Sequence, residues 1–189
     1  MTEQGQEAGA AWKLHAAGMD AELYLPYTLN ELFTQMQKAL IRASNQGLLT
    51  NPIHEILARL KHTPKSERRR SESGILGGDK NFQRVKDGEL KYFERNDGAW
   101  FDFALTLKES PHLTLIAYNF EIRFPEGFAA KFIRFDLNPP DHANEERGLR
   151  AHMHPGSDDI LVPYFIMDPL ELLRMMIHEF RVTRPELRT

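Results

Sequence analysis

The longest alternating stretch of the sequence is HLTLIAYNFEIRF, which spans residues 112–124. Its large apolar side chains recur at every second position from Ile116 to Phe124, and small or polar residues lie between them. This period is that of a β-strand with one face on a hydrophobic core and the other face in water. Residues 100–107 and 131–137 show the same period, so we predict a strand at each of the three segments.

Short turn sequences between these segments predict that the strands run antiparallel. NDG at residues 96–98 precedes the first of the three strands, and PEG at residues 125–127 separates the last two. An Asp-Gly pair at residues 87–88 indicates an earlier hairpin. Further short extended pieces are expected at residues 150–154 and 160–163. Together these segments predict an antiparallel meander.

Helices are predicted on both sides of the meander. TLNE at residues 28–31 has the spacing of a capping box, and apolar residues with helical period follow it until Gly47. Asn51 can cap a second helix that has Pro52 at its first position and ends before Pro64. DPLE at residues 168–171 begins a third helix in the same way.

The predicted fold class is therefore α+β, an antiparallel meander sheet flanked by helices, with an N-terminal helical pair. Residues 61–72 are rich in Lys and Arg, and Gly74, Gly77 and Gly78 follow them closely. We therefore predict three parts: an N-terminal helical extension (1–62), a basic and Gly-rich linker (63–80) and an α+β core domain (81–189).

Composition excludes several classes of protein. The chain has 189 residues, a formal net charge of −3 and no Cys, so disulfide scaffolds, thiolate metal sites and Cys nucleophiles are excluded. Any metal would be held by His, Asp or Glu. No apolar run approaches the roughly 18 residues that span a membrane, and the first residues lack the pattern of a signal peptide. We expect a soluble, cytoplasmic protein with no membrane partner.

Candidate site residues are concentrated between residues 134 and 159. His152 and His154 are two positions apart and, together with Arg150, share one face of the predicted strand. Arg134 and Asp136 share a face of the strand before it. Neutral imidazole at near-neutral pH suits general acid–base work, and arginine suits a phosphate, so these residues could form a catalytic site without metal.

A divalent metal is an equally open interpretation of the same residues. His152 and His154 could share an ion, with His142 and Asp136 as further ligands. The His-x-His element is also similar to the metal strand of cupin barrels, although their Glu and Gly spacing is absent. A third interpretation is structural: His residues that bond to loop carbonyls, an Arg134–Asp136 ion pair and a turn at residues 155–156.

The region from Tyr118 to Leu173 resembles the TumE-type toxin family of bacterial toxin–antitoxin systems. The matching elements are an aromatic strand, RFDLN at residues 134–138, PDH at 140–142, HMH at 152–154 and PLELL at 169–173. The resemblance implies a small toxin that acts on RNA and is masked by a cognate antitoxin. It also implies that His152, His154, His142, Asp136, Arg134 and Arg150 line a ribonuclease site, in which one His removes the 2′-hydroxyl proton and another protonates the leaving oxygen.

A rival interpretation comes from a different class of protein. The chain could be a non-catalytic interaction module, or a metal-binding domain of a bacterial multi-protein system, with the N-terminal helices forming a homodimer or docking a partner protein. The acidic residues that surround the His residues favour this module or a metal over bare phosphate binding.

Overall fold

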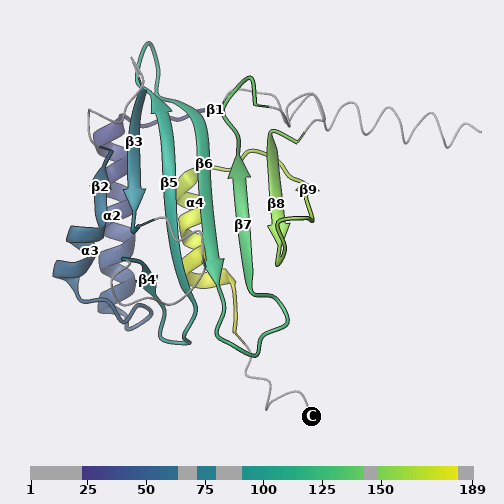
Figure 1. The fold of residues 1–189 in the computed structure, drawn as a ribbon. Helices are drawn as coiled ribbons and strands as arrows, with labels where there is room; N and C mark the ends of the chain where they lie inside the picture. The colour runs from purple at the N-terminus through teal and green to yellow at the C-terminus, as the bar shows by residue number, and fades with distance from the viewer. Residues whose placement is uncertain (1–22, 64–71, 80–90, 143–148, 183–189) are drawn as a thin grey trace, which may run out of the picture.

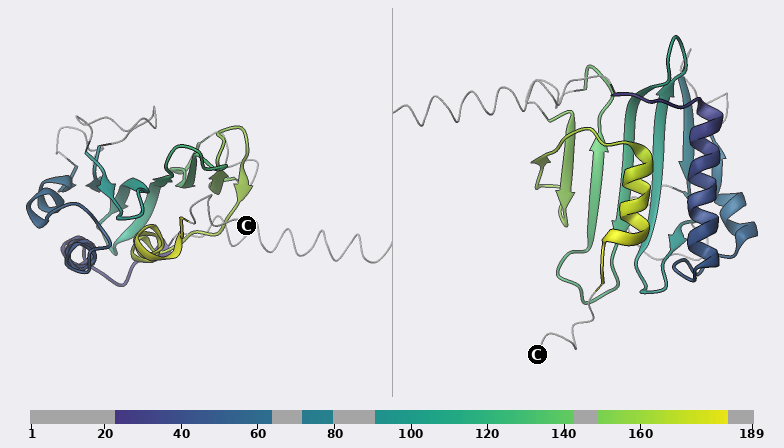
Figure 2. Two further views of the ribbon diagram at one scale, coloured as in Figure 1. Left: turned by 90° about the horizontal axis from the view of Figure 1, so that it is seen from below. Right: turned by 180° about the vertical axis from the view of Figure 1, so that it is seen from behind.

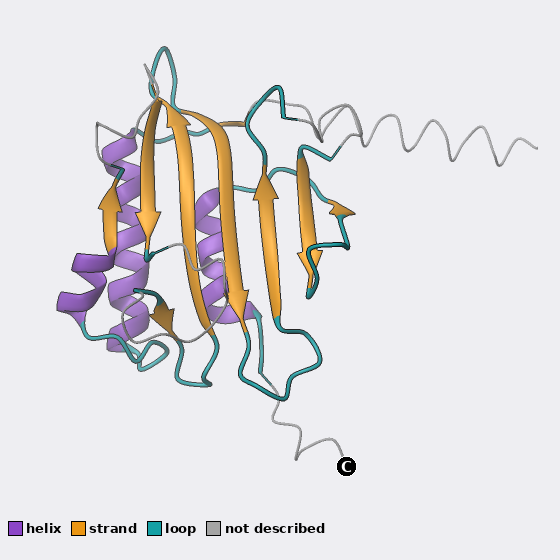
Figure 3. Ribbon diagram, in the orientation of Figure 1, coloured by secondary structure: helices purple, strands orange, loops and turns teal. Residues whose placement is uncertain are grey.

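One large antiparallel sheet carries helices on one of its faces (Figure 1, Figure 3). The structure is a computed structural model that describes residues 23–63, 72–79, 91–142 and 149–182. Its main strands follow the order β2-β3-β5-β6-β7-β8-β9, while β1 pairs with β6 and β4 pairs with β5. Every pairing is antiparallel, so the predicted α+β class with a meander sheet is confirmed.

The strands of the sheet are β1 (Leu23–Tyr24), β2 (Leu60–His62), β3 (Glu72–Gly77), β4 (Phe93–Glu94), β5 (Trp100–Lys108), β6 (Thr114–Arg123), β7 (Phe132–Leu137), β8 (Ala151–Pro155) and β9 (Val162–Pro163). The helices are α2 (Leu29–Asn45), α3 (Ile53–Arg59) and α4 (Pro169–Arg174), and a π-helical turn, η3 (Met175–Glu179), continues α4. Figure 2 shows α2 and α4 side by side against the same face of the sheet.

Both predicted ends of α2 and the predicted start of α4 are confirmed. The Thr28 hydroxyl accepts from the backbone N–H of Glu31 at 3.2 Å, and the Thr28 N–H donates to the Glu31 carboxylate at 2.8 Å, which completes the capping box. Gly47, with a φ of +69°, follows the end of α2. The Asp168 carboxylate accepts from the Leu170 N–H at 2.7 Å and begins α4.

The second predicted helix differs from the structure at both ends. Pro52, and not Asn51, is the N-cap residue of α3. The buried Asn51 side chain instead accepts from the backbone N–H of Glu94 at 2.6 Å and so ties α3 to β4. The helix stops at Arg59 because Leu60 enters β2 and pairs with Gly77 of β3.

The predicted linker at residues 63–80 is wrong for its second half. Residues 72–77 form β3, which pairs with β2 on one side and β5 on the other. Two glycines of β3 allow neighbouring side chains to pack against its backbone. A Cβ on Gly77 would lie 2.2 Å from the Phe103 ring, and a Cβ on Gly74 would lie 2.2 Å from the Thr63 hydroxyl. Residues 64–71, with the basic run at Arg68–Arg70, lie outside the described residues, as does the hairpin predicted at 87–88.

The hydrophobic core lies between the sheet and the helices α2 and α4. Phe101, Phe103, Leu105 and Leu107 are buried on one face of β5, as their alternation predicts. Side chains of α2 and α4 join them in one cluster, so the N-terminal residues from Leu23 onward belong to the same packed unit as the sheet. No helix among the described residues has the length and apolar character needed to cross a bilayer.

The opposite face of the sheet is not the wet surface that the alternation predicts. Asp102, Glu121 and Arg123 project from this face and are buried. The Arg123 guanidinium donates to the carboxylates of Asp102 and Glu121, in each case at 2.8 Å. A β-bulge is a second departure: β5 and β6 shift register after Thr106, so Ile116 has no opposing residue and is only partly buried.

Candidate functional site

The candidate site lies where β6, β7 and β8 run side by side. Asp136 on β7 faces Asn119 on β6 and His152 on β8, and Arg134 faces Glu121 and His154 in the same way. Their chain neighbours Phe135, Leu137 and Ala151 belong to the hydrophobic core. Because side chains alternate across a strand, the polar residues project from the face that α2 and α4 do not cover.

Asp136, His152 and His154 bring three potential ligand atoms together, all within 4.8 Å of one another. The Oδ2 atom of Asp136 lies 3.4 Å from Nε2 of His154 and 3.7 Å from Nε2 of His152. These separations exceed those of a good N–H···O hydrogen bond. Two ligands of a tetrahedral ion with bonds of 2.0–2.1 Å lie about 3.4 Å apart. The two distances from Asp136 to the His nitrogens are therefore close to the spacing of ligands on one metal ion, and all three atoms lie within 4.8 Å of one another.

The His152 ring is held in the orientation of a metal ligand. Its Nδ1 lies 2.8 Å from the carbonyl oxygen of Leu149, which can only accept a hydrogen bond. The proton is therefore on Nδ1, and the lone pair of Nε2 faces Asp136 and His154. A backbone carbonyl behind the ring is the usual second partner of a metal-binding histidine. The Nδ1 of His154 is buried and has no hydrogen-bond partner in the described part of the chain.

Asp136 is held in its charged form by its neighbours. Arg134 Nε donates to Oδ2 at 2.7 Å, and the Asn119 amide donates to Oδ1. Burial raises the pKa of Asp136, but the contacts with His154, Arg134 and Asn119 outweigh burial and hold this pKa below its usual range. A carboxylate oxygen has lone pairs enough to accept from Arg134 and still bind a cation.

His152 is expected to stay neutral below the usual pH of histidine titration, because its pKa is lowered. Burial lowers its pKa more than the charge of Asp136 raises it. In metal-free protein, NMR titration of the imidazole carbons should give His152 a pKa below the value of about 6.5 in urea-unfolded protein. Between these two pKa values the unfolded chain binds more protons than the folded chain. The contribution of neutral His152 to stability is therefore full above a pH of about 6.5 and is lost as pH falls through its lowered pKa. A native pKa above 6.5 would contradict this expectation.

Two predicted site residues do not join the cluster. Arg150 is buried, but its guanidinium donates to the carbonyl oxygens of Asn138 and Ile116 at 3.2 and 3.4 Å and so joins the backbones of β6 and β7. His142 is exposed and is not part of the group of ligand atoms. Arg134 lies at the cluster, but three carboxylates surround it, at Glu121, Asp136 and Asp158.

The sequence pattern missed the residues that support the cluster. Asn119 and Glu121 occupy the alternate positions of the longest strand, which were assigned to solvent. Leu149 contributes through its backbone carbonyl, which no side-chain pattern reveals. The polar residue Asn119, opposite Asp136, is the one signal that could have pointed to these supporting residues, and it can be recognised only when the strand register is known.

Two imidazoles and one carboxylate are a donor set that suits zinc, manganese or iron. His152, His154 and Asp136 supply this set from two adjacent strands. Comparisons with models of known protein families, with curated proteins and with solved structures found no match for this chain. The geometry of the site is therefore the guide to its chemistry.

Proposed function

We propose that the protein binds a divalent transition metal ion at Asp136, His152 and His154 and that this site hydrolyses RNA, as in a toxin-like ribonuclease. The observation that carries the metal site is the convergence of three donor atoms within 4.8 Å, one of them on a ring of fixed orientation. The choice of RNA as the substrate rests on the resemblance of Tyr118 to Leu173 to the TumE-type toxins.

The geometry favours a metal site over a pair of His residues that act as acid and base. Cleavage of RNA by such a pair needs one group at the attacking oxygen and the other at the leaving oxygen, on opposite sides of the phosphorus. The rings of His152 and His154 have centroids 4.9 Å apart, and both Nε2 atoms face the same carboxylate. A phosphate does not fit between them, whereas one ion does.

The residues around the cluster have separate tasks in this proposal. The metal would supply a bound water of low pKa, the usual route to hydrolysis at neutral pH. Leu149 and Asn119 hold His152 and Asp136 in place. A cavity of ≈200 Å³ beside Asp136 has a mixed lining, with Thr106, Asn119 and Asn138 among its polar residues and Ala104, Ala117 and Leu137 among its apolar ones, and offers room for a substrate. Arg134 positions Asp136 and does not bind a phosphate in this proposal, because its guanidinium already pairs with three carboxylates.

Titration of EDTA-treated protein with Zn²⁺ or Mn²⁺ tests the metal site. We expect calorimetry to give one ion per chain, and we expect Asp136→Asn to weaken binding at least tenfold because an anionic ligand is lost. Asp158→Asn is the matched control: it removes a carboxylate that contacts Arg134 but does not belong to the three ligands. Equal affinity in the wild type and Asp136→Asn would overturn the proposed ligand set.

Induced expression in bacteria distinguishes this proposal from the interaction module. A toxin-like ribonuclease acts in the cytoplasm, arrests growth and is relieved by a cognate antitoxin. A chain that binds no metal and leaves growth unchanged would support the module. In that case we propose a homodimer through the N-terminal helices, for which the exposed apolar side chains of Ile53 and Leu57 on α3 are the contact surface.

A further inference from the structure

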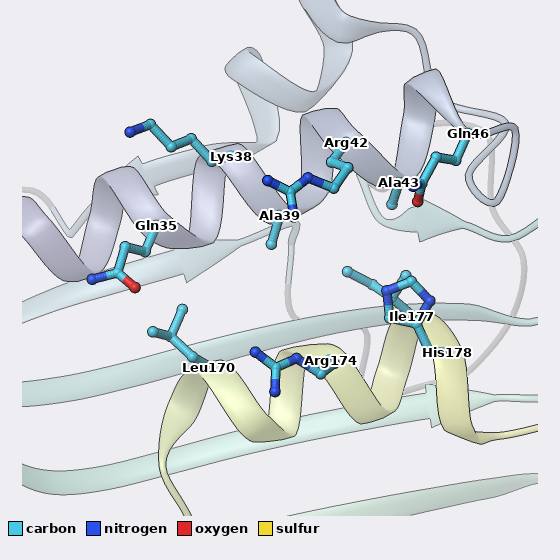
Figure 4. Close-up of a pocket in the computed structure, with 10 residues that line it drawn as sticks. All are labelled: Gln35, Lys38, Ala39, Arg42, Ala43, Gln46, Leu170, Arg174, Ile177 and His178. Carbon is cyan, nitrogen blue, oxygen red and sulfur yellow. The ribbon is translucent and has the colours of Figure 1, made fainter.

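A groove runs between α2 and α4 on the helical side of the molecule, across the sheet from the Asp136 cluster (Figure 4). Its volume is ≈280 Å³, and its lining extends along α2 from Gln35 to Gln46 and along α4 and η3 from Leu170 to His178. The eleven steps from Gln35 to Gln46, at a rise of 1.5 Å each, give a length of about 16 Å. The groove is thus about three helical turns long.

The rims of the groove are cationic. Lys38 and Arg42 lie on the α2 side, Arg174 and His178 lie on the other side, and none of the lining residues is acidic. Lys38, Arg42 and Arg174 are exposed, and within the described ranges none of the three takes part in an ion pair. Such a concentration of positive charge, on a chain with a net charge of −3, favours an anionic ligand.

The floor of the groove is apolar. Ala39 of α2 and Leu170 of α4 line it with partly exposed apolar side chains, and Ala43 and Ile177, which also line it, are buried. The lining contains no Phe, Tyr or Trp, the side chains on which the bases of single-stranded nucleic acid stack. An apolar floor between charged rims fits an amphipathic helix, which places apolar side chains in the groove and charged side chains at its edges.

We propose that this groove binds an acidic amphipathic helical segment of a partner protein, about three turns long. Its apolar stripe packs on the partly exposed Ala39 and Leu170, and its carboxylates pair with Lys38, Arg42 and Arg174. The groove and the Asp136 cluster lie on opposite faces of the sheet and share no residue, so this interaction does not depend on the metal site.

Fluorescence anisotropy with a designed peptide tests this proposal. The probe is a labelled 14-residue helical peptide with Leu on one face and Glu on the flanks. We expect saturable binding that weakens as salt rises, because exposed charges are screened. Arg42→Glu/Arg174→Glu should weaken binding at least tenfold. The control Lys108→Glu/Lys131→Glu makes the same change of charge at exposed lysines outside the groove and should retain the affinity of the wild type.

Three results with the acidic peptide would overturn the proposal. They are the absence of saturable binding, an equal loss of binding in the control variant, and displacement of the peptide by single-stranded RNA of the same net charge at equal concentration. A peptide with Lys in place of every Glu should not bind, and binding of that peptide at equal strength would also contradict a cationic groove. Thermal unfolding of both double variants checks that the fold is retained.

Discussion

Simultaneous replacement of His152 and His154 by Ala is expected to abolish metal binding and any growth arrest caused by induced expression. The two rings supply two of the three donor atoms in the cluster. Structural zinc sites with four ligands bind with about 10–16 kcal/mol, or roughly 3 kcal/mol per ligand. Loss of two ligands should therefore weaken binding by more than about 10³-fold.

Calorimetry measures the loss of metal binding, and growth curves measure the loss of growth arrest. The matched control is His112→Ala/His142→Ala, which removes two exposed imidazoles that do not belong to the cluster. If the His152→Ala/His154→Ala variant loses metal but still arrests growth, the toxic activity does not reside at this site. If it keeps its metal, the ligand assignment is wrong.

The replacement of Arg123 by Met should destabilise the fold by about 3–5 kcal/mol at neutral pH. Arg123 lies between the carboxylates of Asp102 and Glu121, all three are buried, and its guanidinium also lies 4.5 Å from the centre of the Trp100 ring. Removal of this charge leaves two negative charges close together in a region of low dielectric, the condition under which breaking a buried ion pair is most costly.

Urea unfolding of a small set of variants identifies the cause of this loss. Arg123→Met/Asp102→Asn/Glu121→Gln removes all three charges and should recover much of the stability, because replacing a buried ionic group as a whole costs less than breaking it. Arg59→Met breaks the ion pair of Arg59 with Glu55 on α3, where the Glu55 side chain is 38% exposed, and should cost about 1 kcal/mol or less. Equal losses in Arg123→Met and the triple variant would show that packing, and not charge, is responsible.

The strands β5 to β7 and the starts of α2 and α4 are predictable because they depend on local signals. The apolar period at Phe101, Phe103 and Leu105 matches the buried face of β5, and the capping box at Thr28 begins α2 where it was expected. The glycines of β3 show the limit of such signals. Gly74 and Gly77 are typical of a linker, but they lie in the sheet. They are glycines there because the Thr63 and Phe103 side chains occupy the space that a Cβ would need.

The candidate site was predictable in part. His152 and His154 share a face because they are two positions apart on one strand, and this prediction needs no tertiary information. Arg150 was expected on the same face, but it precedes the first residue of β8 and its guanidinium donates to two backbone carbonyls. His142 was expected as a ligand from its closeness in sequence, yet the sheet does not bring it to the cluster.

The sequence by itself determined where β5, β6, β7, α2 and α4 form, which side chains alternate along these strands, and that any metal ligands are His, Asp or Glu. Tertiary structure decided which of them meet: the register of β7 against β8 places Asp136 opposite His152, sixteen positions away. It also buried Arg123, Asp102 and Glu121 on a face that the alternation assigns to water. The physical reason is that side-chain period is a property of one strand, whereas strand register and the covering of a face depend on segments far apart in the chain.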